Sequence, residues 1–156
     1  MGFDIRTTLD FFNKLQEDYR EFCKDKTDSR NALNCAMTAW HITDWAYNEF
    51  NQQLLAQFPT LPSFQQDIKK QCPSLQIMND ITNKAKHYRI TRYKPSIKET
   101  ELHHGAFSKE FSREFDISAL EIELNDGTFI YFEDEIKTVI DFWTRYLQTT
   151  LNITIS

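Results

Sequence analysis

Polar side chains between residues 80 and 94 have the types that acid–base chemistry on a phosphodiester requires. Asn83 and His87 are four residues apart, as are Asp80 and Lys84, so each pair shares one face of a helix. A histidine near the carboxyl end of a helix is readily protonated, because the macrodipole favours a cation there. Such an imidazole can transfer protons while neighbouring lysines hold the anion. The alternative interpretation is a solvated helix face with an Asp–Lys pair.

The segment Asn83–Lys94, NKAKHYRITRYK, is strongly basic in a chain whose formal net charge is −5. Residues 83–98 include six Lys or Arg side chains and no Asp or Glu. Cations interleaved with tyrosines are typical of surfaces that bind single-stranded nucleic acid. The expected RNA or phosphate contacts are Lys84, Lys86, Arg89, Arg92 and Tyr93. The alternative is that this surface pairs with an acidic surface of the same molecule or of a second copy.

A second candidate group, His41, Asp44 and Asn48, recurs at helical spacing on an earlier helix. Asp44 falls inside the apolar arc of the helical wheel. Burying a carboxylate there is costly unless it is paired or strongly hydrogen-bonded. We expect its partner to be His41, or Lys84 or His87 if the two helices pack together. Asp44 then either joins two helices through a polar network or orients and charges a catalytic histidine.

Metal and thiol chemistry have weaker signals. The candidate metal ligands are His41, Asp44, His87, His103 and His104. The sequence has no HxxxH or HExxH motif, no CxxC spacing and no glycine-rich phosphate loop. We predict neither a metal site nor a cofactor, and we expect reduced thiols at Cys23, Cys35 and Cys72.

Length and composition predict one globular domain comprising residues 1–156. Thirteen Phe, six Tyr and three Trp provide large side chains for its core. No apolar run approaches the roughly 20 residues that span a bilayer. The chain also begins without the pattern of a signal peptide. We therefore expect a cytoplasmic protein without membrane contact.

Apolar residues recurring every three or four positions predict most of the chain to be helical. The expected helices cover residues 8–24, 30–57, 63–71, 73 to about 89, and 133–149. Residues 120–124 instead alternate between apolar and acidic, and Asp126-Gly127 then precedes TFIYF, which predicts a β-hairpin. A weaker strand is expected over residues 99–107. The prediction is a mainly α fold, a bundle of four to five helices with a β-hairpin before the last helix.

Two sequence stretches carry a resemblance to a known family. They are SRNALNCAMTAWHITDW (Ser29–Trp45) and DITNKAKHYRITR (Asp80–Arg92), followed by the hairpin and a Trp-containing last helix. This layout resembles the HEPN superfamily of nucleotide- and RNA-handling domains. The Asn-x-x-Lys-His pattern, here Asn83, Lys86 and His87, is similar to that of small uncharacterised bacterial and phage-associated proteins.

The resemblance implies a homodimer, since HEPN ribonucleases bring an Arg and a later His together across a dimer. His87 matches the histidine, whereas Asp80, Ile81 and Thr82 stand where the Arg is expected. A lysine lacks the bidentate fork of Arg, so a substitute such as Lys84 would hold phosphate differently.

The leading interpretation is a HEPN-like domain that contacts RNA or nucleotides, with metal-independent endoribonuclease activity as its catalytic form. In that form His87 is the general acid–base, Asp44 or His41 supports it, and Asn83 belongs to the site. The alternative is a non-catalytic module that binds or regulates a partner protein, in a defence or toxin–antitoxin type of system.

Overall fold

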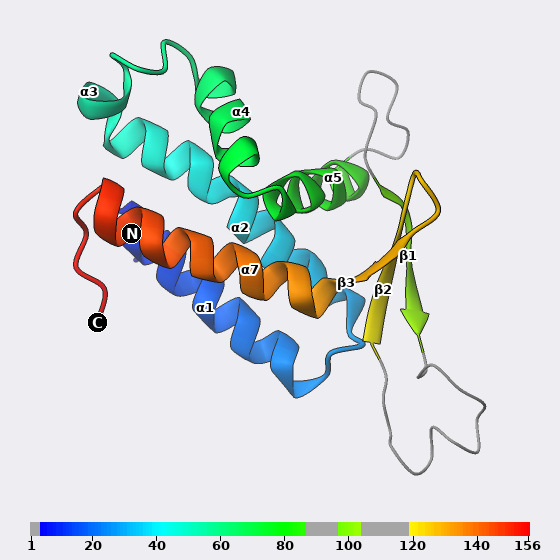
Figure 1. The fold of residues 1–156 in the computed structure, drawn as a ribbon. Helices are drawn as coiled ribbons and strands as arrows, with labels where there is room; N and C mark the ends of the chain where they lie inside the picture. The colour runs from blue at the N-terminus through cyan, green and yellow to red at the C-terminus, as the bar shows by residue number, and fades with distance from the viewer. Residues whose placement is uncertain (1–3, 87–96, 104–118) are drawn as a thin grey trace.

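The computed structural model describes residues 4–86, 97–103 and 119–156. It is a helical bundle with a small antiparallel sheet at one end (Figure 1). The predicted mainly α fold with a hairpin before the last helix is confirmed. The elements are α1 Thr8–Lys24, α2 Ser29–Glu49, α3 Asn51–Leu54, α4 Leu61–Gln71, α5 Ser74–Lys86, β1 Ile97–His103, β2 Ala119–Leu124, β3 Phe129–Tyr131, α7 Phe132–Arg145 and the π-helix η1 Tyr146–Thr150.

Helices α1 and α2 pack closely along their lengths, and local capping residues define where each begins. The Thr7 hydroxyl accepts a hydrogen bond from the Asp10 amide at 3.1 Å, and the Asp10 carboxylate accepts one from the Thr7 amide. Asp28 caps α2 by accepting hydrogen bonds from the Arg30 and Asn31 amides. The Thr8 amide donates to the Glu49 carboxylate at 2.7 Å, which joins the beginning of α1 to the end of α2.

The helix predicted over residues 30–57 is interrupted at Phe50. This residue has φ −105° and ψ 28°, outside the α region, and the chain resumes as the one-turn helix α3. Beyond the break, Leu54 is buried and the Tyr47 hydroxyl donates to the Phe58 carbonyl at 2.7 Å. The prediction of one continuous helix is wrong because this packing outweighs the local helical pattern. The described residues therefore form six α-helices rather than four to five.

The sheet has the order β1-β2-β3 with antiparallel pairing throughout. Gly127 in the β2–β3 turn has φ +87°, a conformation that favours glycine. The Leu124 amide donates to the Thr128 carbonyl at 2.8 Å and closes the turn. The hairpin prediction is confirmed, and β1 confirms the weaker strand as far as His103, beyond which the predicted strand lies outside the described residues.

The hydrophobic core lies between the helices and one face of the sheet. Trp143 of α7 is fully buried, and its indole N–H donates to the Ala39 carbonyl of α2 at 3.0 Å. Phe22 and Phe132 pack edge to face with ring centroids 5.2 Å apart, and Ile122 of β2 is also fully buried. In the described ranges, no helix combines the length and apolar character needed to cross a bilayer.

Candidate functional site

The α5 candidates occupy the last turns of that helix before it ends at Lys86. The Asn83 side-chain amide donates to Asn79 Oδ1 at 3.0 Å, and both side chains are at least half-buried. Lys84 is half-buried on the same helix. The remaining candidates of this group, which lie outside the described residues, are His87, Arg89, Arg92 and Tyr93.

Asp80 is fully buried, with 0% of its surface exposed. The Gln76 side-chain amide donates to Asp80 Oδ1 at 2.8 Å. The interpretation of this face as solvated is therefore wrong for Asp80, because α5 packs on α2 and α4 along this side. Local sequence does not indicate this burial, since a helical Asp is usually exposed to solvent.

A cation from α4 lies at the same junction. Burial lowers the pKa of the Lys69 ammonium group, and the Asp80 charge opposes this shift. Lys69 Nζ lies 5.0 Å from the centroid of the Trp40 ring, a cation–π geometry. Asp80, Lys69 and Trp40 thus connect α5, α4 and α2. Asp80 and Trp40 are buried and Lys69 is half-buried, and we interpret this junction as primarily structural.

The α2 candidates lie on the solvent-facing side of that helix. Asp44 and His41 are both half-buried. Burial raises the pKa of the Asp44 carboxyl above its ordinary value, and the nearby His41 charge opposes that rise. The expected partner His41 is therefore close enough to act on Asp44. Among the described residues no ion pair joins Asp44 to Lys84, the other expected partner that the structure describes.

An open, shallow hollow is lined by Asp44, Trp45 and Asn48. The Trp45 ring stacks on Phe11 of α1, with centroids 5.3 Å apart and planes 20° from parallel. The Asn48 side-chain amide donates to the Asp44 backbone carbonyl at 2.9 Å, which leaves Asn48 Oδ1 as an acceptor. The hollow therefore combines a supported aromatic surface, a carboxyl with a perturbed pKa, and an amide.

Trp45 was missed by the sequence analysis as a site residue. On the sequence it is one more aromatic side chain of a helix, and nothing local distinguishes it from a core residue. Its place depends on Phe11, which is 34 positions earlier in the chain. The adjacent carboxylate Asp44, inside an apolar arc, was the available signal that this stretch of α2 is unusual.

The α2 hollow and the end of α5 lie apart. Asp44 is in the half of α2 that leads to α3, whereas α5 runs the other way and ends beside the sheet (Figure 1). Lys69 of α4 contacts Trp40 in the middle of α2 and interacts electrostatically with Asp80 in the middle of α5. The middle of α5 therefore lies beside the middle of α2. Because α2 and α5 run in opposite directions from this junction, Asp44 and Lys86 lie toward opposite ends of the α2–α5 pair.

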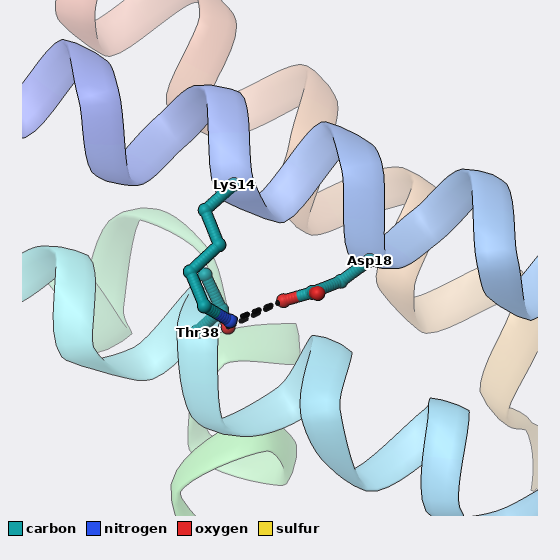
Figure 2. Close-up of polar contacts among 3 residues, drawn as sticks. All are labelled: Lys14, Asp18 and Thr38. Carbon is teal, nitrogen blue, oxygen red and sulfur yellow. Dashed lines mark hydrogen bonds and ion pairs between the residues drawn. The ribbon is translucent and has the colours of Figure 1, made fainter. Parts of the chain in front are cut away.

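A third polar group joins α1 to α2 and is drawn in Figure 2. Lys14 Nζ lies 2.7 Å from Asp18 Oδ2 and donates to the Thr38 hydroxyl at 2.8 Å. The Thr38 hydroxyl donates to Asp18 Oδ2 at 2.7 Å. A hydroxyl between an amine and a carboxylate resembles an activated nucleophile, but Thr38 is only 2% exposed. Without access for a substrate, this group is a structural link.

A second hollow lies between α3, α4 and η1. Its polar groups pair with one another: Gln71 donates to Asp67 at 2.6 Å, and Gln53 donates to the Thr150 carbonyl at 3.0 Å. Burial raises the pKa of the Tyr146 hydroxyl to about 12, so it stays protonated at neutral pH. None of the eight described residues lining this hollow is Lys, Arg or His, which suits it poorly to an anion.

The three cysteines are free thiols, with Cys35 and Cys72 buried and Cys23 exposed. Burial raises the pKa of Cys35 to about 12, which opposes formation of the reactive thiolate. Within the described ranges, no three His, Cys, Asp or Glu side chains are grouped in a way that could hold a metal ion. His103 ends β1, and His104 lies outside the described residues.

Comparisons of this chain with protein-family models, with curated proteins and with solved structures found no match.

Proposed function

We propose that the protein contacts RNA or nucleotides, and that the α2 hollow holds a base. The observation that carries the proposal is the grouping of Trp45, Asp44 and Asn48 around one open hollow, beside His41. An aromatic ring with hydrogen-bonding groups at its margin is the arrangement by which proteins bind unpaired bases.

The stacked pair supports a rigid platform for a base. Phe11 covers the Trp45 ring in a near-parallel stack, so the indole has little rotational freedom to lose when a ligand binds. Stacking of one base on an aromatic side chain contributes about 1–3 kcal/mol. Because every base has a π-face, this contribution alone does not select a sequence.

The polar groups at the hollow supply hydrogen bonds to a base edge. The ionised Asp44 carboxyl accepts from base N–H groups, and its raised pKa makes the protonated, donating form easier to reach. Asn48 Oδ1 is a second acceptor. Two acceptors favour a base edge that presents two adjacent N–H donor groups, as guanine does with N1–H and N2–H₂.

The phosphate contacts in this proposal come from the basic run predicted from the sequence. Six Lys or Arg side chains between residues 83 and 98, without an acidic one, are enough for a salt-dependent grip on a polyanion. The resemblance to HEPN domains supports the same function class. A homodimer, in which two copies extend the contact surface, belongs to the same proposal.

Binding is tested by titrating a fluorescein-labelled single-stranded RNA 12-mer and measuring anisotropy. We expect Asn48→Ala to weaken binding, whereas Asn34→Ala leaves it unchanged. Asn34 is the matched control because it is another exposed asparagine of α2, outside the hollow. Equal affinities of both variants would exclude the hollow as the binding site.

The salt dependence of binding separates the contribution of phosphate contacts to affinity from that of base contacts. The double variant Arg89→Ala/Arg92→Ala is expected to reduce the slope of log Kd against log salt by about 1.4, that is, about 0.7 per lost contact on single strands. Asn48→Ala should leave that slope unaltered, since it removes no charge. A slope that stays constant in the double variant would contradict the assignment of the basic run.

Metal-independent cleavage is the catalytic form of this proposal. Incubating labelled RNA with the protein in EDTA tests it, with His87→Ala as the comparison. Cutting by the wild type and not by His87→Ala supports His87 as general acid–base. Binding without cutting by either protein supports a non-catalytic RNA-contacting domain.

A second candidate function, a module that binds a partner protein, is favoured by a different observation. Phe129 and Tyr131 of β3 are exposed large hydrophobic side chains, at 52% and 39% of their surface. They lie on the sheet, apart from the α2 hollow.

A further inference from the structure

The second hollow, between α3, α4 and η1, combines apolar surface with polar oxygen atoms. Its buried lining residues Leu54 and Phe58 supply the apolar surface, and Asp67 supplies a carboxylate. Its volume of about 210 Å³ is below the roughly 300–1,000 Å³ of pockets that hold drug-sized ligands. The hollow is therefore suited to a small group rather than to a whole nucleotide.

Tyr146 brings a buried hydroxyl group to this hollow. The side chain is 6% exposed, and its ring packs against the rings of Phe142 and Trp143, with centroids 5.5 Å and 5.7 Å away. In the described part of the chain, no hydrogen bond reaches its hydroxyl. Burial, and then the Asp67 charge, raise the pKa of this hydroxyl to about 12, so the Asp67 carboxylate lies near it. Buried polar groups normally have a partner, and for Tyr146 that partner must come from the hollow.

The groups around the hollow favour a cation. Gln71 donates to Asp67 Oδ2 at 2.6 Å, which leaves Asp67 Oδ1 without a partner among the described residues. Gln53 donates through its side-chain nitrogen to the Thr150 carbonyl at 3.0 Å, so Gln53 Oε1 is a further acceptor. Helix α4 ends at Gln71, and the helix formed by α7 and η1 ends at Thr150. Carboxyl ends of helices carry partial negative charge, which adds to that of Asp67.

Basic residues that neighbour the lining residues in the sequence do not neutralise the hollow. Lys70 and Arg145 are exposed, and neither lines it. The charge that acts on the Tyr146 hydroxyl is that of Asp67. The hollow therefore has one carboxylate and no basic lining residue among the described residues.

An alkylammonium group matches these features better than a guanidinium group does. An ammonium is a compact charge with three N–H donors, which suits separate acceptors at Asp67, Gln53 and the Tyr146 hydroxyl. A guanidinium binds a carboxylate best through both oxygens, and Gln71 already holds the second oxygen of Asp67. The alkyl stem next to an ammonium packs on apolar surface, which the lining also provides.

We infer that the second hollow binds a primary alkylammonium group, with Asp67 and Tyr146 as its main contacts. Two sources have this chemistry: the side chain of a lysine in a partner protein, and a free small amine. The inference does not depend on RNA binding, because it uses none of the residues of the α2 hollow or of the basic run.

The chemical class is tested by titrating the full-length protein with n-butylammonium chloride at constant ionic strength. Proton–nitrogen NMR correlation spectra follow the side-chain amide signals of Gln53 and Gln71. We expect these signals to shift with a Kd below about 10 mM, and n-butanol and n-butylguanidinium to bind at least about tenfold more weakly. Equal binding of n-butanol, tighter binding of n-butylguanidinium, or no saturation by n-butylammonium up to about 100 mM would each overturn the inference.

Variants test which residues bind the ammonium group. Asp67→Asn is expected to weaken binding about tenfold, since it removes the charge but keeps an acceptor for Gln71. Asp141→Asn is the matched control, because it removes an exposed carboxylate of α7 outside the hollow. If Asp141→Asn weakens binding as much as Asp67→Asn, the attraction is only that of net charge and the inference fails.

Tyr146→Phe tests the hydroxyl while keeping the packed ring. We expect about threefold weaker binding of n-butylammonium, from loss of one hydrogen bond. Urea denaturation should show no loss of stability, because the hydroxyl has no partner in the described part of the chain. Unchanged binding, or a clear loss of stability, would contradict the role given to this hydroxyl.

Two further ligands separate the sources of the ammonium group. Acetyl-Gly-Lys-Gly-amide presents a lysine side chain on a peptide, and cadaverine is a free diamine with a stem of similar length. Tighter binding of the peptide than of n-butylammonium supports a lysine of a partner protein, whereas tighter binding of cadaverine supports a free amine. Saturation by neither ligand would exclude both sources and overturn the inference.

Discussion

The Lys69 ammonium group of α4 lies 5.0 Å from the centroid of the Trp40 ring of α2. Asp80 of α5 is fully buried nearby; burial lowers the pKa of the Lys69 ammonium group, and the Asp80 charge offsets part of that shift. Three helices that are separate in the sequence therefore meet at one cation, one ring and one carboxylate. This junction fixes how α4 and α5 lie on the central helix.

The Lys69–Asp80 relationship predicts non-additive stability changes. Lys69→Met is expected to lower the free energy of unfolding more in the presence of Asp80 than in an Asp80→Asn background, with a coupling of about 1 kcal/mol. Methionine keeps most of the apolar stem of lysine while removing its charge. Urea denaturation of the wild type, both single variants and the double variant measures the coupling. Additive changes would show that Lys69 and Asp80 do not interact.

Substituting Asp44 with Asn is expected to stabilise the protein in a pH-dependent way. Burial, the larger effect, raises the pKa of this carboxyl above 3.8, so the folded protein retains a proton that the unfolded chain has released. In the window from pH 3.8 up to the raised pKa, this group makes the free energy of unfolding fall as pH rises. Asn does not titrate, so Asp44→Asn should be more stable than wild type at pH 7.

The gain from Asp44→Asn should disappear on acidification below about pH 3.8, where both folded and unfolded wild type are protonated. Chemical denaturation of both proteins from pH 3 to pH 7 measures the difference, and other carboxylates cancel in the comparison. A loss of stability at pH 7 would mean that His41 stabilises the ionised carboxylate by more than burial penalises it.

Substituting Gly127 is expected to lower stability through backbone strain, without a steric clash. Its φ of +87° is rarely adopted by residues with a Cβ, yet a Cβ added there meets no atom within 4 Å. Gly127→Ala is therefore expected to lower the free energy of unfolding by about 1–2 kcal/mol, from backbone strain alone. Gly127→Asn should cost less, because Asn tolerates positive φ better. Thermal unfolding compares the stability of the two variants. Equal losses of stability in both would point to a cause other than the positive φ.

Local signals in the sequence were sufficient for most element positions. Helix α1 covers Thr8–Lys24 as predicted, since its apolar spacing and its Thr7 cap act within a few residues. The β2–β3 hairpin follows in the same way from alternation and Asp126-Gly127. The break at Phe50 was not predictable, because it depends on burying Leu54 and Phe58 against distant elements.

The candidate site was likewise predictable from the sequence only in part. The spacing of His41 and Asp44 on one helix was evident from the sequence, and their electrostatic interaction follows from it. The stacking of Phe11 on Trp45 was not evident from the sequence, because it joins side chains of two helices. The pairing of Glu121 with Tyr131 required the strand register, which alternation alone leaves undetermined.

By itself, the sequence determined the helical content, the hairpin, and the separation of a basic run from an acidic one, because these depend on residue type and short-range spacing. The tertiary structure decided that Asp80 is buried beside Lys69, and that Trp45 borders an open hollow. It also set carboxylates beside rings on the sheet. The physical reason is that burial and cross-element contact depend on which faces pack together, and several packings satisfy the same local pattern.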